Sequence, residues 1–141
     1  MANFSNSSTF IILEKDPICF NHNLETVERL QKEVRRGANY KKSLSLLKKS
    51  KDIAPHIQTK SGIMLGLGET LDEIKNTVYD LKKIDCDQIT IGQYLRPSLN
   101  HLAVKKYWDP SEFEYLYRFS KELGFKKVSS GPLVRSSYHA G

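Results

Sequence analysis

The chain has 141 residues, of which 39% are hydrophobic and 27% are charged, and its formal net charge is +6. This length suits a single domain with a core of its own, and the composition excludes a disordered or fibrous protein. No apolar run approaches the length of a membrane-spanning helix, and residues 1–8 lack the basic stretch of a secretory signal. We therefore expect a globular protein without a membrane partner.

The positive charge is compatible with nucleic-acid binding, but its distribution argues against that function. The lysines are spread along the predicted helices between glutamates, which is typical of solvated helix faces. A nucleic-acid interface would instead cluster arginine, lysine and aromatic residues on one face. An acidic or phosphate-bearing partner would suit the same net charge. We expect no nucleic-acid partner.

The sequence contains two cysteines, Cys19 and Cys86, which are far apart and form no CxxC motif. This excludes a disulfide framework and a metal site built only from cysteines of this chain. Reduced, buried thiols are expected, as in a cytoplasmic protein or, in a eukaryote, a protein of an organelle matrix. The four histidines are not spaced as metal ligands either.

The first part of the chain predicts two short strands and a helix. Apolar runs at 9–13 and 18–20 have the residue types of strands. Apolar residues at three- and four-residue spacing then predict a helix from Val27 to Val34, and Gly37 ends it.

The middle of the chain predicts a second helix, a strand and a third helix. Residues 40–53 have an apolar helical face, and Pro55 ends that helix. Residues 57–65 predict a strand. Thr70 and Glu73 then have the spacing of a capping box, which predicts the start of the next helix.

The last part predicts a strand at 88–95, a loop to about residue 108 and a helix that begins around 109–112, with aspartate, proline and glutamate in capping positions. A short strand follows at 125–128, and residues 129–141 have no regular pattern. The order of strands and helices predicts right-handed βαβ units and a parallel sheet. Three or four strands are few for such a sheet, so half of a barrel is a natural interpretation.

The stretch from Gly62 to Glu69 begins as a buried strand and ends in glycines and an acid before the next helix. Ligands of α/β proteins lie at the carboxyl ends of parallel strands, and glycine permits a close approach to the backbone. Taken alone, the stretch slightly favours a tight turn without a ligand. The polar segments 21–26 and 135–138 favour the ligand.

Several motifs share their order and spacing with one known family: NHNLET at 21–26, TKSG at 59–62, MLGLGE at 64–69, IGQY at 91–94 and SGPLVRSSYHA at 130–140. From about residue 16 to 141 the chain resembles the carboxyl-terminal half of lipoyl synthase, a radical S-adenosylmethionine enzyme. Residues 1–15 form an amino-terminal tail that resembles nothing in that family.

The resemblance implies an α/β fold whose parallel βα units form the second half of a partial (β/α)6 barrel. Enzymes of the family use S-adenosylmethionine and two [4Fe–4S] clusters to insert sulfur at C6 and C8 of a protein-bound octanoyl group. The implied partner is an octanoylated carrier protein or the lipoyl domain of a dehydrogenase complex. The cysteines that hold both clusters lie in the amino-terminal half of the family, and this chain contains neither set.

The resemblance implies that Asn23 and Glu25 bind the ribose of S-adenosylmethionine, with Asn21 and His22 beside them. An amide and a carboxylate two residues apart at a strand end can reach one face and suit ribose hydroxyls. From the residues alone, helix capping by Asn23, with Glu25 in the first helical turn, is the better interpretation.

The same resemblance assigns Gly66 and Glu69 to the adenine side of the cofactor and Lys60 to a carboxylate. From the residues alone, Glu69 is equally explained as an acid at a helix start, and Lys60 as a solvated lysine on a strand edge. Gln93 and Tyr94, at the tip of a strand, are expected to line the cavity, although Tyr94 also suits the core.

The terminal RSSY motif carries the remaining roles. By family position, Ser137 rather than Ser136 is the serine ligand of the sulfur-donating cluster, and Arg135 orients the loop or contacts substrate. Without the resemblance, a capped polar tail explains the motif. No other residue of this chain is assigned a catalytic role.

Two functions remain open at this stage. The chain is either a truncated lipoyl synthase that is inactive alone, or a non-catalytic remnant or complementing half that needs a partner chain. In both cases we expect no sulfur insertion by this chain alone, because the cluster cysteines are missing from it.

Overall fold

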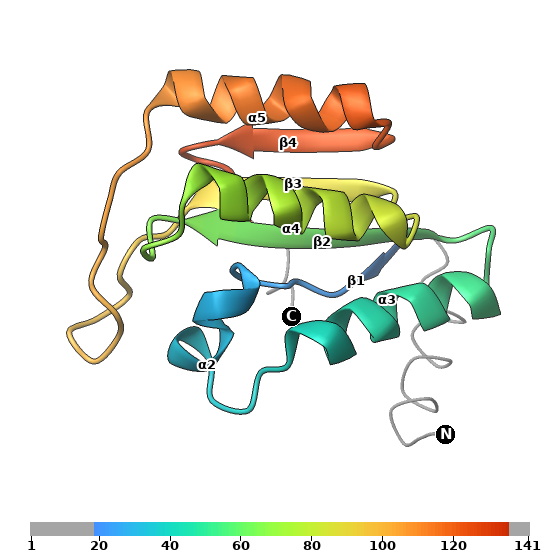
Figure 1. The fold of residues 1–141 in the computed structure, drawn as a ribbon, viewed down its shortest axis with the longest axis horizontal. Coiled ribbons are helices and arrows are strands. Elements are labelled where there is room, and N and C mark those ends of the chain that lie inside the picture. Colours follow the sequence, from blue (N-terminus) through green and yellow to red (C-terminus); the bar gives the residue numbers. More distant parts are fainter. Residues whose placement is uncertain (1–18, 136–141) are drawn as a thin grey trace.

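The computed structural model describes residues 19–135, and the predicted strand at 9–13 and the predicted serine ligands, Ser136 and Ser137, lie outside this range. Four parallel strands form one sheet in the order β1-β2-β3-β4 (Figure 1). They are β1 (Cys19–Asn21), β2 (Gln58–Leu65), β3 (Gln88–Gln93) and β4 (Lys127–Gly131). The predicted α/β alternation and parallel sheet are confirmed.

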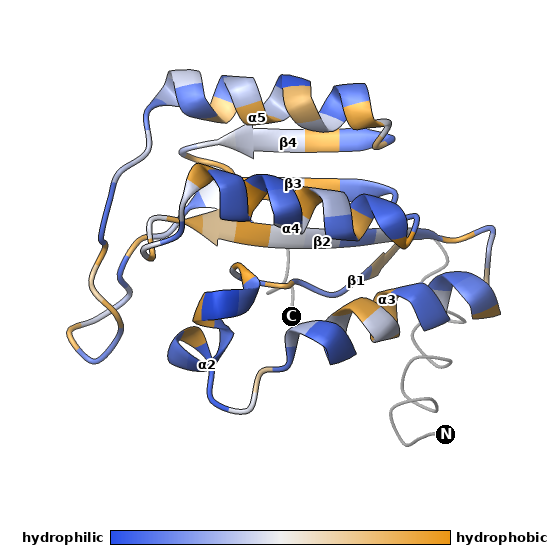
Figure 2. Cartoon of the chain, viewed as in Figure 1, coloured by the Kyte–Doolittle hydropathy of each residue, from blue (hydrophilic) through white to orange (hydrophobic). Residues whose placement is uncertain are grey.

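The helical elements are η1 (Glu28–Leu30), α2 (Gln31–Val34), α3 (Tyr40–Ile53), α4 (Leu71–Lys83) and α5 (Pro110–Leu123). Sequential strand order with right-handed crossovers places connecting helices on one face of a sheet. Figure 1 shows α4 and α5 on the same side of the sheet, and hydrophobic and hydrophilic residues alternate along the helices (Figure 2). None of the helices within residues 19–135 is long and apolar enough to cross a membrane.

The helix-covered face of the sheet forms the core. Side chains alternate across a strand, so every second residue of β2 and β3 points at the helices. The fully buried residues of this core come from the strands and from α3, α4 and α5: Leu65, Ile89, Ile91, Leu47, Ile74, Val78, Leu81, Phe113 and Leu116.

Apart from Met64, the opposite face of the sheet carries small and polar residues, and no helix from the described part of the chain covers it. The register places them in three rows across the strands: Asn21, Lys60, Gln88 and Lys127; Gly62, Thr90 and Ser129; Met64, Gly92 and Gly131. A second apolar layer has little to pack against on such a surface. This face is therefore suited to polar ligands rather than to a hydrophobic core.

The predicted helix starts of α4 and α5 are confirmed. The Thr70 hydroxyl accepts a bond from the Glu73 N–H at 3.1 Å, and the Glu73 carboxylate accepts one from the Thr70 N–H at 2.9 Å. At α5 the Glu112 carboxylate accepts a bond from the Asp109 N–H at 2.8 Å. Both acids satisfy N–H groups that a helix start leaves without intrahelical partners.

Several element boundaries differ from the predictions. The strand predicted at 88–95 ends at Gln93, and the strand predicted at 57–65 begins at Gln58. The helix predicted from Val27 to Val34 is a 3-10 turn followed by a single helical turn. The Gln31 amide donates to the Leu24 and Thr26 carbonyls, both at 2.8 Å, which holds the preceding backbone outside the helix. The last strand begins at Lys127 and continues to Gly131, because Ser129 to Gly131 pair with β3.

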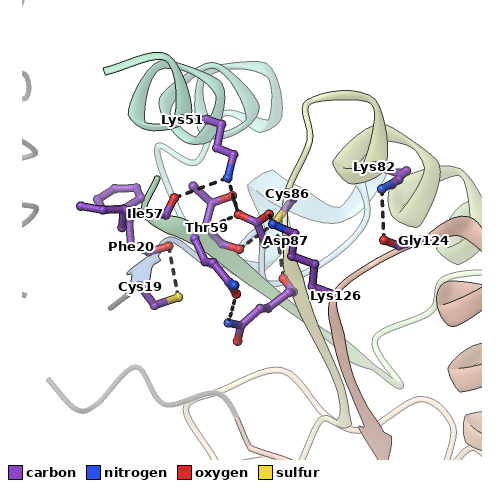
Figure 3. A network of polar contacts seen from close by, with 12 residues as sticks. Cys19, Phe20, Lys51, Ile57, Thr59, Lys82, Cys86, Asp87, Gly124 and Lys126 are labelled. Atoms are coloured by element: carbon purple, nitrogen blue, oxygen red, sulfur yellow. Dashed lines mark hydrogen bonds and ion pairs between the residues drawn. The ribbon is translucent and has the colours of Figure 1, made fainter. Parts of the chain in front are cut away.

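The amino ends of the strands are joined by one buried carboxylate, that of Asp87 (Figure 3). It lies 2.7 Å from Lys51 Nζ and 3.3 Å from Lys126 Nζ, and it accepts a bond from the Thr59 N–H at 2.8 Å. Asp87 therefore connects α3, β2 and the start of β4. This end of the sheet is the one remote from the glycine stretch.

Candidate functional site

A cavity of about 590 Å³ lies against the small and polar face of the sheet, toward the carboxyl ends of the strands. Its walls come from the segment after β1, from β2 and β3, and from the segment after β4. The lining residues are Asn23, Glu25, Arg35, Gly62, Ile63, Met64, Thr90, Gly92, Gln93, Leu95, Val134 and Arg135.

The backbone after β1 leaves the sheet and then rejoins it. The Leu24 N–H donates to the Ser61 hydroxyl at 3.1 Å instead of to a strand carbonyl. Glu25 then pairs with β2, since its N–H donates to Gly62 O at 3.0 Å and its carbonyl accepts from Met64 N at 2.9 Å. An interruption of this kind changes the direction of the side chains beside it. Both Asn23 and Glu25 reach the cavity.

Glu25 has φ of 73°, which is unusual for a residue other than glycine. Such a conformation costs on the order of 1–3 kcal/mol and persists where the surroundings hold it in place. Here the two bonds to β2 hold it. Helix capping does not explain this pair, because the first helical turn begins at Glu28 after Val27, which makes no side-chain capping bond.

The electrostatics of this corner depend on Arg35. Burial raises the pKa of the Glu25 carboxyl, and the positive charge of Arg35 partly opposes the rise. Burial and Arg35 together lower the pKa of His22, whose Nε2 lies 3.0 Å from the Ser43 hydroxyl. The cavity wall therefore carries the Glu25 carboxyl group and the Arg35 guanidinium. His22 does not line this cavity, and its imidazole is neutral at neutral pH.

Two glycines form the cavity floor because no side chain would fit there. A Cβ on Gly62 would overlap the Thr90 hydroxyl and lie 3.1 Å from the Asn23 Oδ1 atom. A Cβ on Gly92 would overlap the Val134 carbonyl oxygen. These glycines let polar groups of three segments converge on the sheet.

The converging groups fit the ribose part of a nucleoside. Asn23 and Glu25 both line this cavity and carry an amide and a carboxyl group, and a ribose presents two neighbouring hydroxyl donors. On the same face of the sheet, Asn21 has a buried Oδ1 without a hydrogen-bond partner among residues 19–135. A buried carbonyl oxygen in this state favours a donor beside it, but Asn21 does not itself line the cavity.

Comparison with known proteins gives strong sequence matches. The chain is 80% identical over 130 residues to lipoyl synthase 2 of Prochlorococcus marinus subsp. pastoris, covering 92% of this chain and 44% of that protein. It is 57% identical over 131 residues to lipoyl synthase 2 of Nostoc sp., covering 93% of this chain and 44% of that protein. It is 54% identical over 130 residues to lipoyl synthase of Hydrogenovibrio crunogenus, covering 92% and 41%. The chain is a lipoyl synthase homologue.

The family resemblance found in the motifs is thereby confirmed, and the homologue spans less than half the length of these relatives. No protein-family profile matches it. Among solved structures, SuiB of Streptococcus suis superposes with a TM-score of 0.67 at 15% identity, covering 87% of this chain and 29% of SuiB. At that identity the likeness concerns the fold alone.

Of the predicted site residues, Asn23, Glu25, Gln93 and Arg135 line the cavity in this homologue. Asn21 and Lys60 lie on the same face of the sheet and are not among the residues that line it. The binding roles of all these residues stay predictions.

Glu69 lies behind the cavity wall and holds the glycine loop. Its carboxylate accepts bonds from the Gly66 N–H at 2.7 Å, the Leu67 N–H at 3.0 Å and Trp108 Nε1–H at 2.9 Å. Gly66 packs against the Gln93 side chain and the Lys106 carbonyl. In this structure both predicted cofactor residues shape the loop rather than line the cavity.

We expect Glu69→Gln to lower the free energy of unfolding by about 1–3 kcal/mol, because the amide nitrogen cannot accept and leaves a buried N–H without a partner. The chain contains one tryptophan, Trp108, so its fluorescence reports directly on this site. Thermal unfolding and the emission maximum are the measurements. Glu122→Gln, at an exposed position on α5, is the control and should change neither. An unchanged emission maximum and stability in Glu69→Gln would contradict the assignment.

Gln93 and Tyr94 brace the loop after β3. The Gln93 amide donates to the Lys106 carbonyl at 2.9 Å and accepts from the Trp108 N–H at 3.0 Å. The Tyr94 hydroxyl donates to the Leu102 carbonyl at 2.6 Å. Tyr94 is buried and does not line the cavity. Gln93 is also buried, but it does line the cavity.

Sequence reasoning missed Arg35. It follows α2, lines the cavity and acts electrostatically on both His22 and Glu25. In the sequence it is one of two arginines before Gly37, and this pattern is also typical of solvated arginines at a helix end. Two adjacent arginines indicate a cavity-lining residue only when the path of α2 past the sheet is known.

The thiols of the described residues do not fit an iron–sulfur cluster. Cys19 and Cys86 lie at the amino ends of β1 and β3, away from the cavity. Burial raises the pKa of the Cys86 thiol to about 12, which disfavours the thiolate that a cluster requires. Residues 19–135 contain no group of three or more histidine, cysteine or acidic side chains that could hold a metal ion.

Proposed function

We propose that this chain supplies the carboxyl-terminal half of a lipoyl synthase, and that its four strands are the second half of a partial (β/α)6 barrel. The observation that carries the proposal is the 80% identity to a lipoyl synthase 2 over 92% of the chain. The sheet supports it, because sequential parallel strands with helices on one side leave the other face for a barrel interior.

In this proposal the cavity holds the nucleoside part of S-adenosylmethionine. Asn23 and Glu25 accept hydrogen bonds from the ribose hydroxyls, and the wall at Gly62 and Thr90 contacts the base. Arg35 and Arg135 attract the carboxylate of the methionyl group. The cofactor, when bound together with a reduced cluster, supplies the radical that activates the octanoyl chain of the carrier.

The clusters themselves do not fit the described residues, so their cysteines must come from another part of the protein or from another chain. The chain alone then binds nucleoside but inserts no sulfur. The substrate would be an octanoylated carrier protein or lipoyl domain. A non-catalytic remnant is the rival function, and it predicts no gain of activity when the missing cysteines are supplied.

We expect Asn23→Ala to weaken the binding of adenosine and of S-adenosylmethionine by about tenfold, because it removes a hydrogen bond from a buried site. Isothermal titration of the full 141-residue chain is the measurement. Asn76→Ala, on α4 and outside the cavity, is the matched control and should bind as the unaltered chain does. Equal affinities for the two variants would contradict the nucleoside site.

Activity is tested by supplying the missing half. The chain is mixed anaerobically with a separately expressed amino-terminal half of a lipoyl synthase that carries its cluster cysteines, and sulfur insertion into an octanoylated lipoyl domain is followed by mass spectrometry. The proposal expects product from the mixture and none from either half alone. Absence of product, with both halves folded and the clusters loaded, would favour the remnant.

A further inference from the structure

The loop between β3 and α5 is long and has no regular secondary structure from Leu95 to Tyr107, but it is well fixed internally. The Arg96 guanidinium donates to the His101 carbonyl at 2.9 Å and to the Leu99 carbonyl at 3.0 Å. The Ser98 hydroxyl lies 2.8 Å from His101 Nδ1. A tight turn with Leu99 at its tip is the result.

The base of the loop is fixed as firmly as its tip. Lys105 N donates to Gly66 O at 2.7 Å, in addition to the bonds that Tyr94 and Gln93 make to the carbonyls of Leu102 and Lys106. These polar groups of the loop are thus hydrogen-bonded within the loop or to the glycine stretch. Long ordered loops of this kind in compact domains are usually functional.

The side chains that the loop presents outward are apolar. Leu99 is 85% exposed and Tyr107 is 68% exposed, and Leu95 and Leu102 are exposed as well. Apolar residues that are gathered on a pre-ordered loop mark interaction sites more often than scattered ones do. Leu95 also lines the cavity, so this surface is continuous with the candidate site.

The loop is also basic. Between residues 95 and 108 it contains Arg96, Lys105 and Lys106 and no acidic residue. A second copy of this chain would bring another positively charged loop and a net charge of the same sign. The remainder of a barrel would add strands beside the edges of the sheet, whereas this loop stands at the carboxyl ends of the strands. An acidic partner fits the positive charge of the loop, and a partner separate from the sheet fits its position at the carboxyl ends of the strands.

We propose that the surface formed by Leu95, Leu99, Leu102, Lys105 and Tyr107 is the docking site for an acidic protein domain that presents a modified side chain to the cavity. The exposure, fixation and charge of the loop carry the docking site. The inference rests on the proposed function for the identity of the domain, which is then an octanoylated lipoyl domain. Leu99 is the central apolar anchor, and Lys105 contributes attraction.

The test measures binding of the full 141-residue chain to an octanoylated lipoyl domain and to the same domain without the acyl group, at two salt concentrations. We expect Leu99→Ser to weaken both affinities about tenfold, as for an interface anchor. Lys105→Glu should weaken them and reduce their salt dependence. Ile53→Ser and Lys49→Glu, at exposed positions of α3, are the matched controls and should leave binding unchanged.

Several outcomes would overturn the docking site. They are equal binding by Leu99→Ser and Ile53→Ser, absence of binding by the unaltered chain, and a change in oligomeric state of Leu99→Ser in analytical ultracentrifugation. Trp108 fluorescence verifies that each variant is folded. Adenosine binding separates the two proposals, and it should be the same in Leu99→Ser and in the unaltered chain. If neither the unaltered chain nor the variants bind adenosine, the nucleoside site is contradicted. Binding of the lipoyl domain alone decides the docking site.

Discussion

Replacement of Asp87 by asparagine is expected to lower the free energy of unfolding at neutral pH by about 2–3 kcal/mol. The carboxylate is buried and lies within reach of two lysines and one backbone N–H, from Lys51, Lys126 and Thr59. Asparagine keeps the shape but removes the charge, and it places an amide donor against a lysine. The value lies at the lower end for a buried pair because the Lys126 side chain is 63% exposed and can turn to water.

The loss should depend on pH. Burial raises the pKa of Asp87, but the bonds from Lys51 and the Thr59 N–H, followed by Lys126, outweigh it and hold the pKa below its ordinary value of 3.8. A carboxyl group whose folded pKa is lowered stabilises the fold above its unfolded pKa, and this contribution is lost as the pH falls through the folded pKa. The difference between Asp87→Asn and the unaltered chain should therefore be full at pH 7 and shrink below about pH 4.

Urea unfolding at pH 7 and pH 3 measures both effects. Asp52→Asn is the control, because Asp52 pairs with Lys48 at 3.6 Å while both side chains are mostly exposed. Exposed pairs contribute about 0–1 kcal/mol. Equal losses for the two variants, or a loss in Asp87→Asn that is the same at both pH values, would refute the role of Asp87.

Much of the fold was predictable because its signals are local. The α3 bounds, the capping boxes at Thr70 and Asp109 and the parallel alternation all follow from short patterns of residues. The predicted helix after Val27 failed for a non-local reason. Arg29, which suits a helical pair with Glu25, instead forms an ion pair with Glu73 of α4 at 2.7 Å. No pattern within residues 25–37 reveals that partner.

The candidate site was predictable for residues that directly follow a strand. It was not predictable for residues whose position depends on the course of a loop. Asn23 and Glu25 follow β1, so their convergence with Gly62 follows from the parallel sheet. The role of Glu69 requires knowledge that the loop before α5 returns Trp108 to the glycine stretch. Arg35 similarly reaches the cavity only because α2 is one turn long.

Gly66→Ala is expected to lower the free energy of unfolding by about 3–5 kcal/mol, from backbone strain together with overpacking. Gly66 has φ of 113°, and a Cβ there would overlap the Gln93 amide and lie 2.6 Å from the Lys106 carbonyl oxygen. Neither neighbour can move freely, because Gln93 and Lys106 are bonded to each other at 2.9 Å.

Gly68→Ala separates the two causes. Gly68 also has φ of 113°, but the nearest atom to its Cβ would be Lys105 Cγ at 4.0 Å. This variant should lose only the strain, about 1–3 kcal/mol. Chemical unfolding measures both variants, and Trp108 emission should shift in Gly66→Ala alone, because that alanine displaces the loop that holds the indole. Equal losses of unfolding free energy in the two variants would show that Gly66 is required for its φ and not for the close contact with Gln93. The packing of the glycine stretch against the loop after β3 would then not depend on that contact.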